Sequence, residues 1–315
     1  MMTMHRLPAI AVFVALSCGS AVCQAQAKRE RLEIDTAWRG QSVTLRPEMH
    51  IPSTPGPHGT VLVLNSSAGA NDIFLSRTPD AFAKLNLATV VLDTYTPRGV
   101  GNTIYDQMKV TTADMNSDAL KVFERLKGDA RVKPGKIAVM GHSKGGLSAV
   151  FLASAGWYTW AGFERAPNFG AAVALAPDCS LQVTGFMQDT VPHFLSVMGE
   201  KDDYTVPAPC VALFQRAKAE GKAVEFHLVK GANHGFSTGM DRYDSQIITL
   251  NGCADDPIVF TTSDRKGVSM SGKKEVAVSD VFKVCGRKGA HVGGTHEAVG
   301  DVLDLVGKWL VARGW

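Results

Sequence analysis

Three side chains that could take part in one nucleophilic reaction stand just after three separate apolar runs of the sequence. Ser143 follows KIAVM, Asp202 follows HFLSVMGEK, and His234 follows VEFHLVKGAN. A serine hydroxyl is a weak nucleophile at neutral pH, so it needs a base within hydrogen-bond reach. Histidine accepts and returns a proton near neutrality, and a carboxylate on its far ring nitrogen fixes the tautomer and stabilises the imidazolium. These residue types predict nucleophilic catalysis if the fold brings the three together.

The glycines around Ser143 have a steric purpose in this interpretation. The segment GHSKGG, residues 141–146, would place the serine on a sharp turn between a strand and a helix, where a neighbouring β-carbon has no room. Gly145 and Gly146 would also let the following helix approach the sheet closely. The N-terminus of that helix favours the negative charge that develops on a reacting carbonyl oxygen.

An oxyanion hole needs two hydrogen-bond donors beside the nucleophile. The first is expected from the backbone N–H of Lys144, directly after the serine. The second is expected from the loop NSSAGAND, where we favour Ser67 over Ser66 and Ala68. The alternative is that this loop is simply polar.

The elements that must position these residues are predicted from hydrophobic periodicity, since short apolar runs favour strands and amphipathic segments favour helices. Strands are expected within residues 60–65, 87–93, 136–140, 170–177, 192–199 and 223–231, and helices from about 144 and within 111–128, 208–221 and 296–315. A hairpin is expected over 32–51 with its turn at Arg39-Gly40. A further helix is expected to open after Thr78-Pro79.

This alternation predicts an α/β protein whose mainly parallel sheet is covered by helices on both faces. In such sheets ligands gather at the carboxyl ends of the strands, where Ser143, Asp202 and His234 are expected to stand. Their chain order, Ser then Asp then His, is that of the triad in α/β-hydrolases. The sequence therefore predicts the α/β-hydrolase fold, with Asp203 competing with Asp202 for the acid position.

Residues 1–27 have the pattern of a cleaved signal peptide. A short polar start precedes the apolar stretch LPAIAVFVAL, and the segment ends in Ala25-Gln26-Ala27. The apolar stretch is too short to span a bilayer comfortably, although a retained anchor is the alternative. Cleavage would leave residues 28–315 as one exported domain, periplasmic or secreted, with no later membrane span.

The net charge of +3, with both signs scattered, gives no case for binding nucleic acid or an anionic membrane.

Four cysteines remain after the predicted cleavage site. An even number in an exported chain predicts two disulfides with three connectivities, and reduced thiols are the alternative. The spacing prefers neighbours in sequence, which pairs Cys179 with Cys210 and Cys253 with Cys285. No C-x-x-C or His/Cys cluster suggests zinc, and the sequence implies no metal and no organic cofactor.

The chain resembles the dienelactone hydrolase family of α/β-hydrolases. The matching segments are LDTYTPRG, GHSKGG, GEKDDYTVP and GANHGF, which cover most of residues 60–236. The resemblance implies that Asp202, rather than Asp203, is the acid and that His234 is the base. The chain is also similar to exported members of the family in which the cysteine of DDYTVPAPC, here Cys210, forms a disulfide with a cysteine shortly after the preceding strand. This resemblance supports the pair Cys179–Cys210. Arg98 matches the arginine of the family's PRG segment. The resemblance implies either a structural role or a place in the substrate pocket for this residue.

Two departures from the family bear on function. The founding enzymes use a cysteine nucleophile, so Ser143 favours general ester hydrolysis over dienelactone itself. Residues 237–296 are long for the family core and form an insertion before the last helix, expected to be a lid, a pocket wall or a peripheral excursion. A Cys253–Cys285 bridge across it would contribute about 3–4 kcal/mol in the chain-entropy model.

The predicted activity is hydrolysis of a small carboxylic ester or lactone through an acyl-enzyme. Tyr95 and Arg98 are candidates for the substrate pocket, although an aromatic residue such as Tyr95 is more often part of a core. A peptidase or an acyltransferase could use the same three residues. The alternative from another class is a binding protein that keeps the fold without catalysis.

Overall fold

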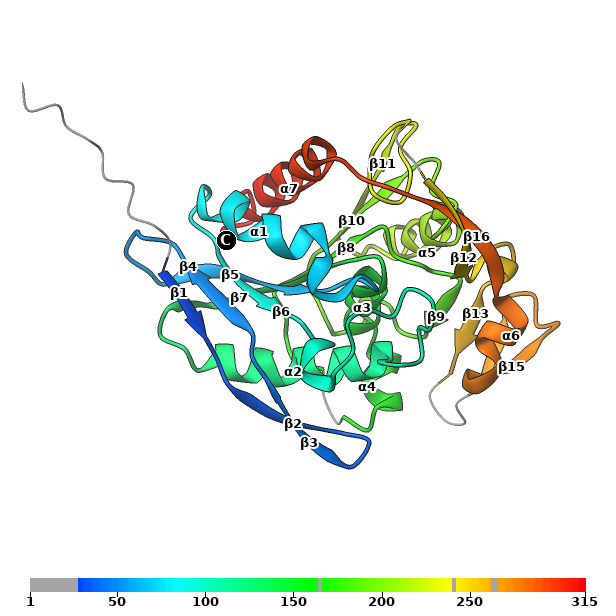
Figure 1. The fold of residues 1–315 in the computed structure, drawn as a ribbon, viewed down its shortest axis with the longest axis horizontal. Coiled ribbons are helices and arrows are strands. Elements are labelled where there is room, and N and C mark those ends of the chain that lie inside the picture. The colour runs from blue at the N-terminus through cyan, green and yellow to red at the C-terminus, as the bar shows by residue number, and fades with distance from the viewer. Residues whose placement is uncertain (1–27, 164–165, 240–241, 262–265) are drawn as a thin grey trace, which may run out of the picture.

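A central eight-stranded sheet organises the computed structural model, which describes residues 28–163, 166–239, 242–261 and 266–315 (Figure 1). The predicted signal peptide lies outside the described residues. In sheet order the strands are β1 (Lys28–Arg31), β4 (Glu48–Ile51), β6 (Ala88–Leu92), β5 (His58–Leu64), β7 (Val132–His142), β8 (Ala171–Leu175), β10 (Phe194–Gly199) and β11 (Val224–Val229). All pairings from β6 to β11 are parallel, and the two antiparallel pairings are those of β4 with β1 and with β6, so β4 alone runs against the other strands of this sheet. The mainly parallel sheet is confirmed.

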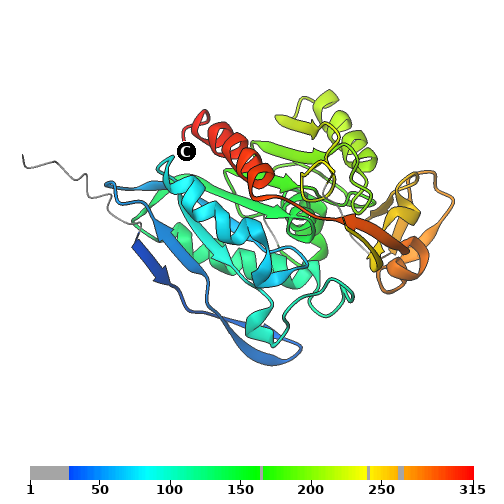
Figure 2. The same ribbon diagram turned by 45° about the horizontal axis from the view of Figure 1, so that its top comes forward.

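Both faces of the sheet are covered by helices, because successive side chains of a strand point to opposite faces. In β5, Val61 and Val63 belong to a core shared with α1 (Ile73–Ala83) and α7 (His296–Val311). Leu62 and Leu64 belong to the core on the other face, shared with α2 (Thr112–Lys127), α3 (Lys144–Leu152), α4 (Ala155–Trp160) and α5 (Pro207–Ala219). Figure 2 shows α1 and α7 together on one face of the sheet. The apolar runs of the central strands match this burial on both faces.

The strand register brings the carboxyl ends of the central strands to one edge. Leu64 pairs with Gly141, His142 with Leu175, and Gly199 with Val229. The loops after β5, β7, β8, β10 and β11 therefore leave the sheet on the same side.

The N-terminal hairpin is shorter than predicted. β2 (Ile34–Trp38) and β3 (Gln41–Leu45) pair around a turn at Arg39-Gly40, where φ is 49° and 78°. The chain then leaves the hairpin at Pro47, which has no amide to extend the ladder, and β4 joins the main sheet instead.

Helix α1 begins earlier than the proline suggested. The side chain of Asp72 accepts a hydrogen bond from Phe74 N and caps the helix, so the helix starts at Ile73 and Pro79 lies inside it. An internal proline removes one hydrogen bond of the helix. The expectation that the helix opens after Thr78-Pro79 is therefore wrong.

The segment 237–296 adds two small sheets beside the main one. β12 (Arg242–Thr249) pairs with β16 (Arg287–Val292), while β13 (Ile258–Phe260), β14 (Lys266–Ser269) and β15 (Glu275–Ala277) extend from β9 (Leu181–Val183). The short helix α6 (Val281–Cys285) completes the segment. Its disulfide joins Cys253 to Cys285, and the second disulfide joins Cys179 to Cys210, which confirms pairing between neighbours in sequence.

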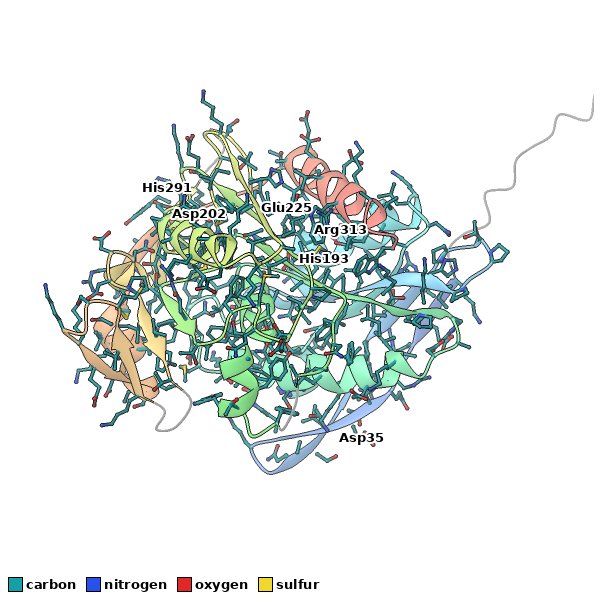
Figure 3. The ribbon with its side chains drawn as sticks, turned by 180° about the vertical axis from the view of Figure 1, so that it is seen from behind. Asp35, His193, Asp202, Glu225, His291 and Arg313 are labelled. Atoms are coloured by element: carbon teal, nitrogen blue, oxygen red, sulfur yellow. A yellow bond between two sulfur atoms is a disulfide. The ribbon has the colours of Figure 1, made fainter. Side chains whose placement is uncertain are left out.

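The last helix is fixed to the far edge of the sheet. Arg313, just beyond α7, donates a hydrogen bond to Glu225 of β11, and both residues are labelled in Figure 3. No helix within the described part of the chain has the length and apolar character needed to cross a membrane.

Candidate active site

Ser143 occupies a strained turn between β7 and α3, with φ 56° and ψ −116°. A β-carbon on Gly141 would lie 2.3 Å from the carbonyl group of Gly145, and one on Gly145 would lie 2.8 Å from the carbonyl oxygen of Asn65. Both distances are shorter than real contacts, so only glycine fits at these two positions. A non-glycine residue in such a conformation costs on the order of 1–3 kcal/mol, and such strain clusters at functional sites.

His234 and Asp202 are hydrogen-bonded, with His234 Nδ1 2.9 Å from Asp202 Oδ2. The carboxylate also accepts bonds from the backbone amides of Tyr204 and Thr205, both 2.9 Å from Oδ1, and from Thr205 Oγ1, 2.8 Å from Oδ2. Because a carboxylate only accepts hydrogen bonds, His234 Nδ1 is the donor in its bond to Asp202. Nε2 of His234 is then the nitrogen available to accept a proton.

Asp203 turns away from His234. Its Oδ1 accepts a hydrogen bond from His291 N at 2.9 Å, and its Oδ2 lies 2.7 Å from His291 Nδ1. Both side chains are nearly half exposed. The structure thus brings Asp202 to the histidine and uses Asp203 to fasten β16 to the loop that carries the acid.

Thr205 contacts both Asp202 and His234, and the sequence interpretation missed it. Its hydroxyl lies 2.8 Å from Asp202 Oδ2, 3.1 Å from His234 Nδ1 and 3.0 Å from the carbonyl oxygen of Ala176. One signal was present in the sequence. An Asp in a loop often forms an Asx turn, in which its carboxylate accepts hydrogen bonds from the amides that follow it, and such a turn at Asp202 would bring Thr205 close.

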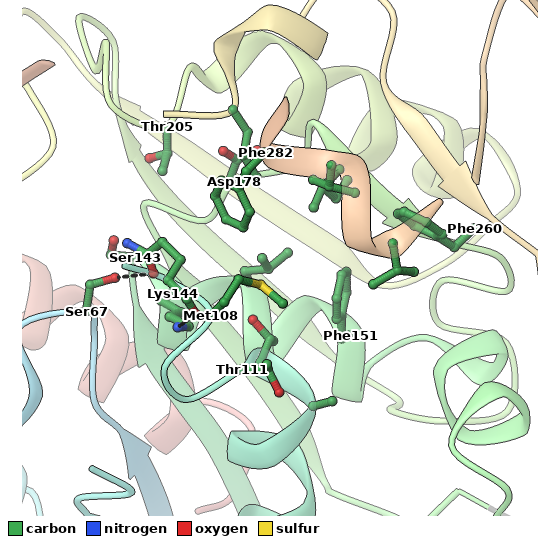
Figure 4. Close-up of a pocket in the computed structure, with 18 of the residues that line it drawn as sticks. Ser67, Met108, Thr111, Ser143, Lys144, Phe151, Asp178, Thr205, Phe260 and Phe282 are labelled. Atoms are coloured by element: carbon green, nitrogen blue, oxygen red, sulfur yellow. Dashed lines mark hydrogen bonds between the residues drawn. The ribbon is translucent and has the colours of Figure 1, made fainter. Parts of the chain in front are cut away.

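A cavity of about 250 Å³ opens beside Ser143 (Figure 4). Ser67, Ser143, Lys144 and Thr205 line it on the side of the strand ends. Many of the other lining side chains are apolar and come from α3, α4 and the 237–296 segment, including Leu147, Phe151, Trp157, Phe260 and Phe282. No group of three or more His, Cys, Asp or Glu side chains that could hold a metal occurs among the residues the structure describes.

The amides around Ser67 differ in what they bond to. Ser66 N donates to Asp72 Oδ2 at 2.8 Å, and Ala68 N donates to Ser66 Oγ at 3.2 Å. The amide of Ser67 has no acceptor among the described residues. The amide of Lys144 is the first of α3, where helix amides have no intrahelical partner. These two N–H groups are therefore available to a ligand.

The Lys144 side chain fixes another wall of the cavity. Its Nζ donates to the carbonyl oxygens of Gln107 and Val110 at 2.7 and 2.6 Å and to Thr103 Oγ1 at 3.3 Å. Burial lowers the pKa of Lys144 to about 7. These hydrogen bonds hold the 103–110 segment against the turn that carries Ser143.

Neither Arg98 nor Tyr95 is among the described residues that line the cavity, which corrects the pocket role expected of them. Arg98 forms a buried bidentate pair with Asp118, with N···O distances of 2.7 and 2.9 Å, so its contacts favour the structural role. Tyr95 is fully buried beneath the Lys144 side chain, and its hydroxyl accepts a bond from Thr103 Oγ1 at 3.1 Å.

Replacing Arg98 by methionine is expected to lower the free energy of unfolding by about 3–5 kcal/mol, because it leaves the Asp118 carboxylate buried without its partner. Lys127→Ala, which removes an exposed pair with Glu124, is the control and should cost at most about 1 kcal/mol. Urea unfolding measures both. A loss below about 1 kcal/mol for Arg98→Met would contradict the structural role.

Comparisons with known proteins bear on the fold and on the class of chemistry. The sequence model of the prolyl oligopeptidase family matches residues 157–250, which include Asp202 and His234 but not Ser143. No curated protein matches the chain.

Several solved structures resemble the chain at low identity. Esterase 2 of Thermogutta terrifontis, phosphoramylated by tabun, is 14% identical with a TM-score of 0.55, over 90% of this chain and 95% of that chain. A dienelactone hydrolase-like promiscuous phosphotriesterase from metagenomic libraries is 17% identical with a TM-score of 0.47, over 66% and 84%. Dipeptidyl peptidase 4 of Porphyromonas gingivalis is 17% identical with a TM-score of 0.49, over 68% of this chain and 33% of that chain. The first of these matches covers nearly all of both chains, and this chain has a mainly parallel sheet with helices on both faces, so the chain has the α/β-hydrolase fold.

Proposed function

We propose that the chain is a serine hydrolase that cleaves a carboxylic ester or lactone through an acyl-enzyme intermediate. The observation that supports this most is the His234–Asp202 hydrogen bond, on loops that leave the sheet on the same side as the strained turn of Ser143. The turn that carries Ser143 also contacts the loop that carries His234, because His142 Nε2 lies 3.2 Å from the carbonyl oxygen of His234.

In the first half of the proposed reaction, Ser143 Oγ attacks the ester carbonyl while His234 Nε2 takes its proton. Asp202 holds the histidine in the tautomer that leaves Nε2 free and stabilises the imidazolium. The amides of Lys144 and Ser67 donate to the oxyanion of the tetrahedral intermediate. Collapse of this intermediate breaks the bond to the alkoxide oxygen, which leaves with the proton from His234.

In the second half, a water molecule attacks the acyl group on Ser143 and gives its proton to His234. The second tetrahedral intermediate releases the carboxylic acid as the proton returns to Ser143 Oγ. With a lactone, the alcohol and the acid remain in one product molecule. Each step needs only the groups named and water.

A peptidase is the second candidate, because the prolyl oligopeptidase family model matches the part of the chain that carries Asp202 and His234. An acyltransferase would use the same intermediate with an alcohol in place of water. Turnover of an ethyl ester, its matching amide and the ester with added alcohol separates the three. Faster cleavage of the amide than of the ester would favour the peptidase.

Export to an oxidising compartment belongs to the same proposal. The two disulfides are consistent with it, since disulfides persist outside the cytosol. The 237–296 segment is proposed as a wall of the substrate site, because Ile248, Phe260 and Phe282 line the cavity.

Fluorophosphonate labelling of the purified protein tests the nucleophile without knowledge of the substrate. We expect one adduct, on the peptide that carries Ser143, because an activated serine attacks phosphorus as it attacks a carbonyl carbon. The solved esterase from Thermogutta terrifontis was phosphoramylated by tabun, an organophosphorus reagent of related reactivity. No adduct on folded protein, or an adduct elsewhere, would leave the non-catalytic binding protein as the better reading.

A further inference from the structure

Asp178 lines the cavity beside Ser143 but has no part in the proposed reaction. It lies in the loop after β8, whose last residue, Leu175, accepts a hydrogen bond from Ser143 N at 2.8 Å. Thr205 Oγ1 lies 3.0 Å from the carbonyl oxygen of the next residue, Ala176. The disulfide of Cys179 then fixes the loop to α5. The Asp178 carboxyl is therefore held rigidly at the wall of the cavity, where it is labelled in Figure 4.

The hydrogen bonding of Asp178 differs from that of Asp202. Asp202 is surrounded by four donors, whereas Ser180 is the residue that hydrogen-bonds to Asp178, with its amide 2.7 Å from Oδ1. Burial, with the charge of Asp202 adding to it, raises the pKa of Asp178 to about 6. Asp178 is thus ionised at about pH 8, although only 8% of its surface is exposed. A buried carboxylate is costly unless further donors or a cation reach it.

The rest of the cavity lining supplies no such cation. Lys144 is the one basic side chain among the described residues that line it, and its Nζ is engaged with three acceptors of the 103–110 segment. Most of the remaining lining is apolar or aromatic. A cavity of about 150 Å³ with such walls holds benzene, so the volume of about 250 Å³ admits an aromatic ring with a short chain.

We propose that Asp178 binds the ammonium group of the substrate, so that the enzyme prefers aromatic esters that carry an amine near the scissile bond and disfavours anionic ones. The inference rests on the proposed function, since it names the substrate class of the Ser143 site. The aromatic walls suit the ring of such a substrate, and cations also interact favourably with aromatic faces. A carboxylate on the substrate would face Asp178 with no cation to compensate it.

Ligand binding to the Ser143→Ala protein tests this without any catalysis. Calorimetry at about pH 8 compares 2-phenylethylammonium with 2-phenylethanol, which differ only in the group offered to Asp178. We expect the ammonium ligand to bind about tenfold more tightly or better, and Asp178→Asn in the same background to lower that ratio by about tenfold. The measured quantity is the ratio of the two dissociation constants. A substitution that weakens the binding of both ligands equally leaves this ratio unchanged. Asp203→Asn, an exposed carboxylate on the next loop, is the matched control and should leave the ratio as it is.

An equal ratio with and without Asp178→Asn would overturn the inference. A measurement that needs no substitution at Asp178 guards against a variant that does not fold. The anion 3-phenylpropanoate should bind less tightly than 2-phenylethanol, and tighter binding of the anion would also refute the assignment.

Turnover and labelling distinguish this inference from the function it rests on. If fluorophosphonate does not label Ser143 but binding depends on Asp178, the hydrolase proposal fails and the ammonium site stands. If phenylalanine ethyl ester and ethyl 3-phenylpropanoate are hydrolysed equally well, and Asp178→Asn leaves their ratio unchanged, the site assignment fails and the hydrolase stands.

Discussion

Replacing Ser143 by alanine is expected to reduce kcat for ester hydrolysis by roughly 10⁴- to 10⁶-fold. The substitution removes the only atom that would form the acyl-enzyme, while the oxyanion donors and the cavity stay in place, so that a small residual rate remains. Alanine carries a β-carbon like serine, so it tolerates φ 56° no worse than serine does and the fold should persist.

The measurement is the steady-state rate on a chromogenic ester, with circular dichroism to confirm folding. Ser76→Ala is the matched control: the same change in an exposed serine of α1, whose hydroxyl bonds within its own helix. It should keep the parent rate. A Ser143→Ala protein within about tenfold of the parent would exclude Ser143 as the nucleophile.

Asp202→Asn is expected to lower kcat by about 10⁴-fold. The two backbone amides that bind Oδ1 would bind the amide oxygen of the asparagine, which places its NH₂ group opposite His234 Nδ1. A donor at that position favours the tautomer with its proton on Nε2, and this tautomer cannot accept the proton of Ser143. Packing changes little, so the loss should fall on kcat and leave the free energy of unfolding nearly as it was.

Asp203→Asn separates this explanation from a general effect of losing a charge in the same loop. The Asp203 carboxylate contacts His291 at the protein surface, so this variant should stay within about threefold of the parent rate. A larger loss in Asp203→Asn than in Asp202→Asn would mean that the acid is wrongly assigned. The pair is informative because the two residues are adjacent and chemically identical.

The aspartate that bonds to His234 could be predicted from the sequence only in part. Residue types and their place after the strands limited the choice to Asp202 and Asp203, and family resemblance favoured the first. The choice itself depends on the turn at 202–205, whose amides and Thr205 hydroxyl converge on one carboxylate and point it at His234. Sequence distance does not encode that direction, so Thr205 was missed as well.

The position of the 237–296 segment could not be predicted from the sequence either. Its length was evident from the sequence, but whether it lines the cavity was not. That depends on β13 pairing with β9, a contact between residues more than seventy positions apart, and on Asp203 holding β16. Such contacts place Phe260 and Phe282 in the wall of the cavity that Ser143 also lines.

By itself the sequence determined what depends on local periodicity and sterics: the alternation of strands and helices, the mainly parallel sheet and the glycine turn around Ser143, while it only favoured the disulfide pairing that the structure has. The tertiary structure decided what depends on where side chains meet. It paired Arg98 with Asp118 instead of leaving it in the pocket, capped α1 at Asp72 ahead of Pro79, and turned Asp178 into the cavity. The physical reason is that backbone pattern is set by neighbours in the chain, whereas the partner of a buried charge is set by whichever distant element packs against it.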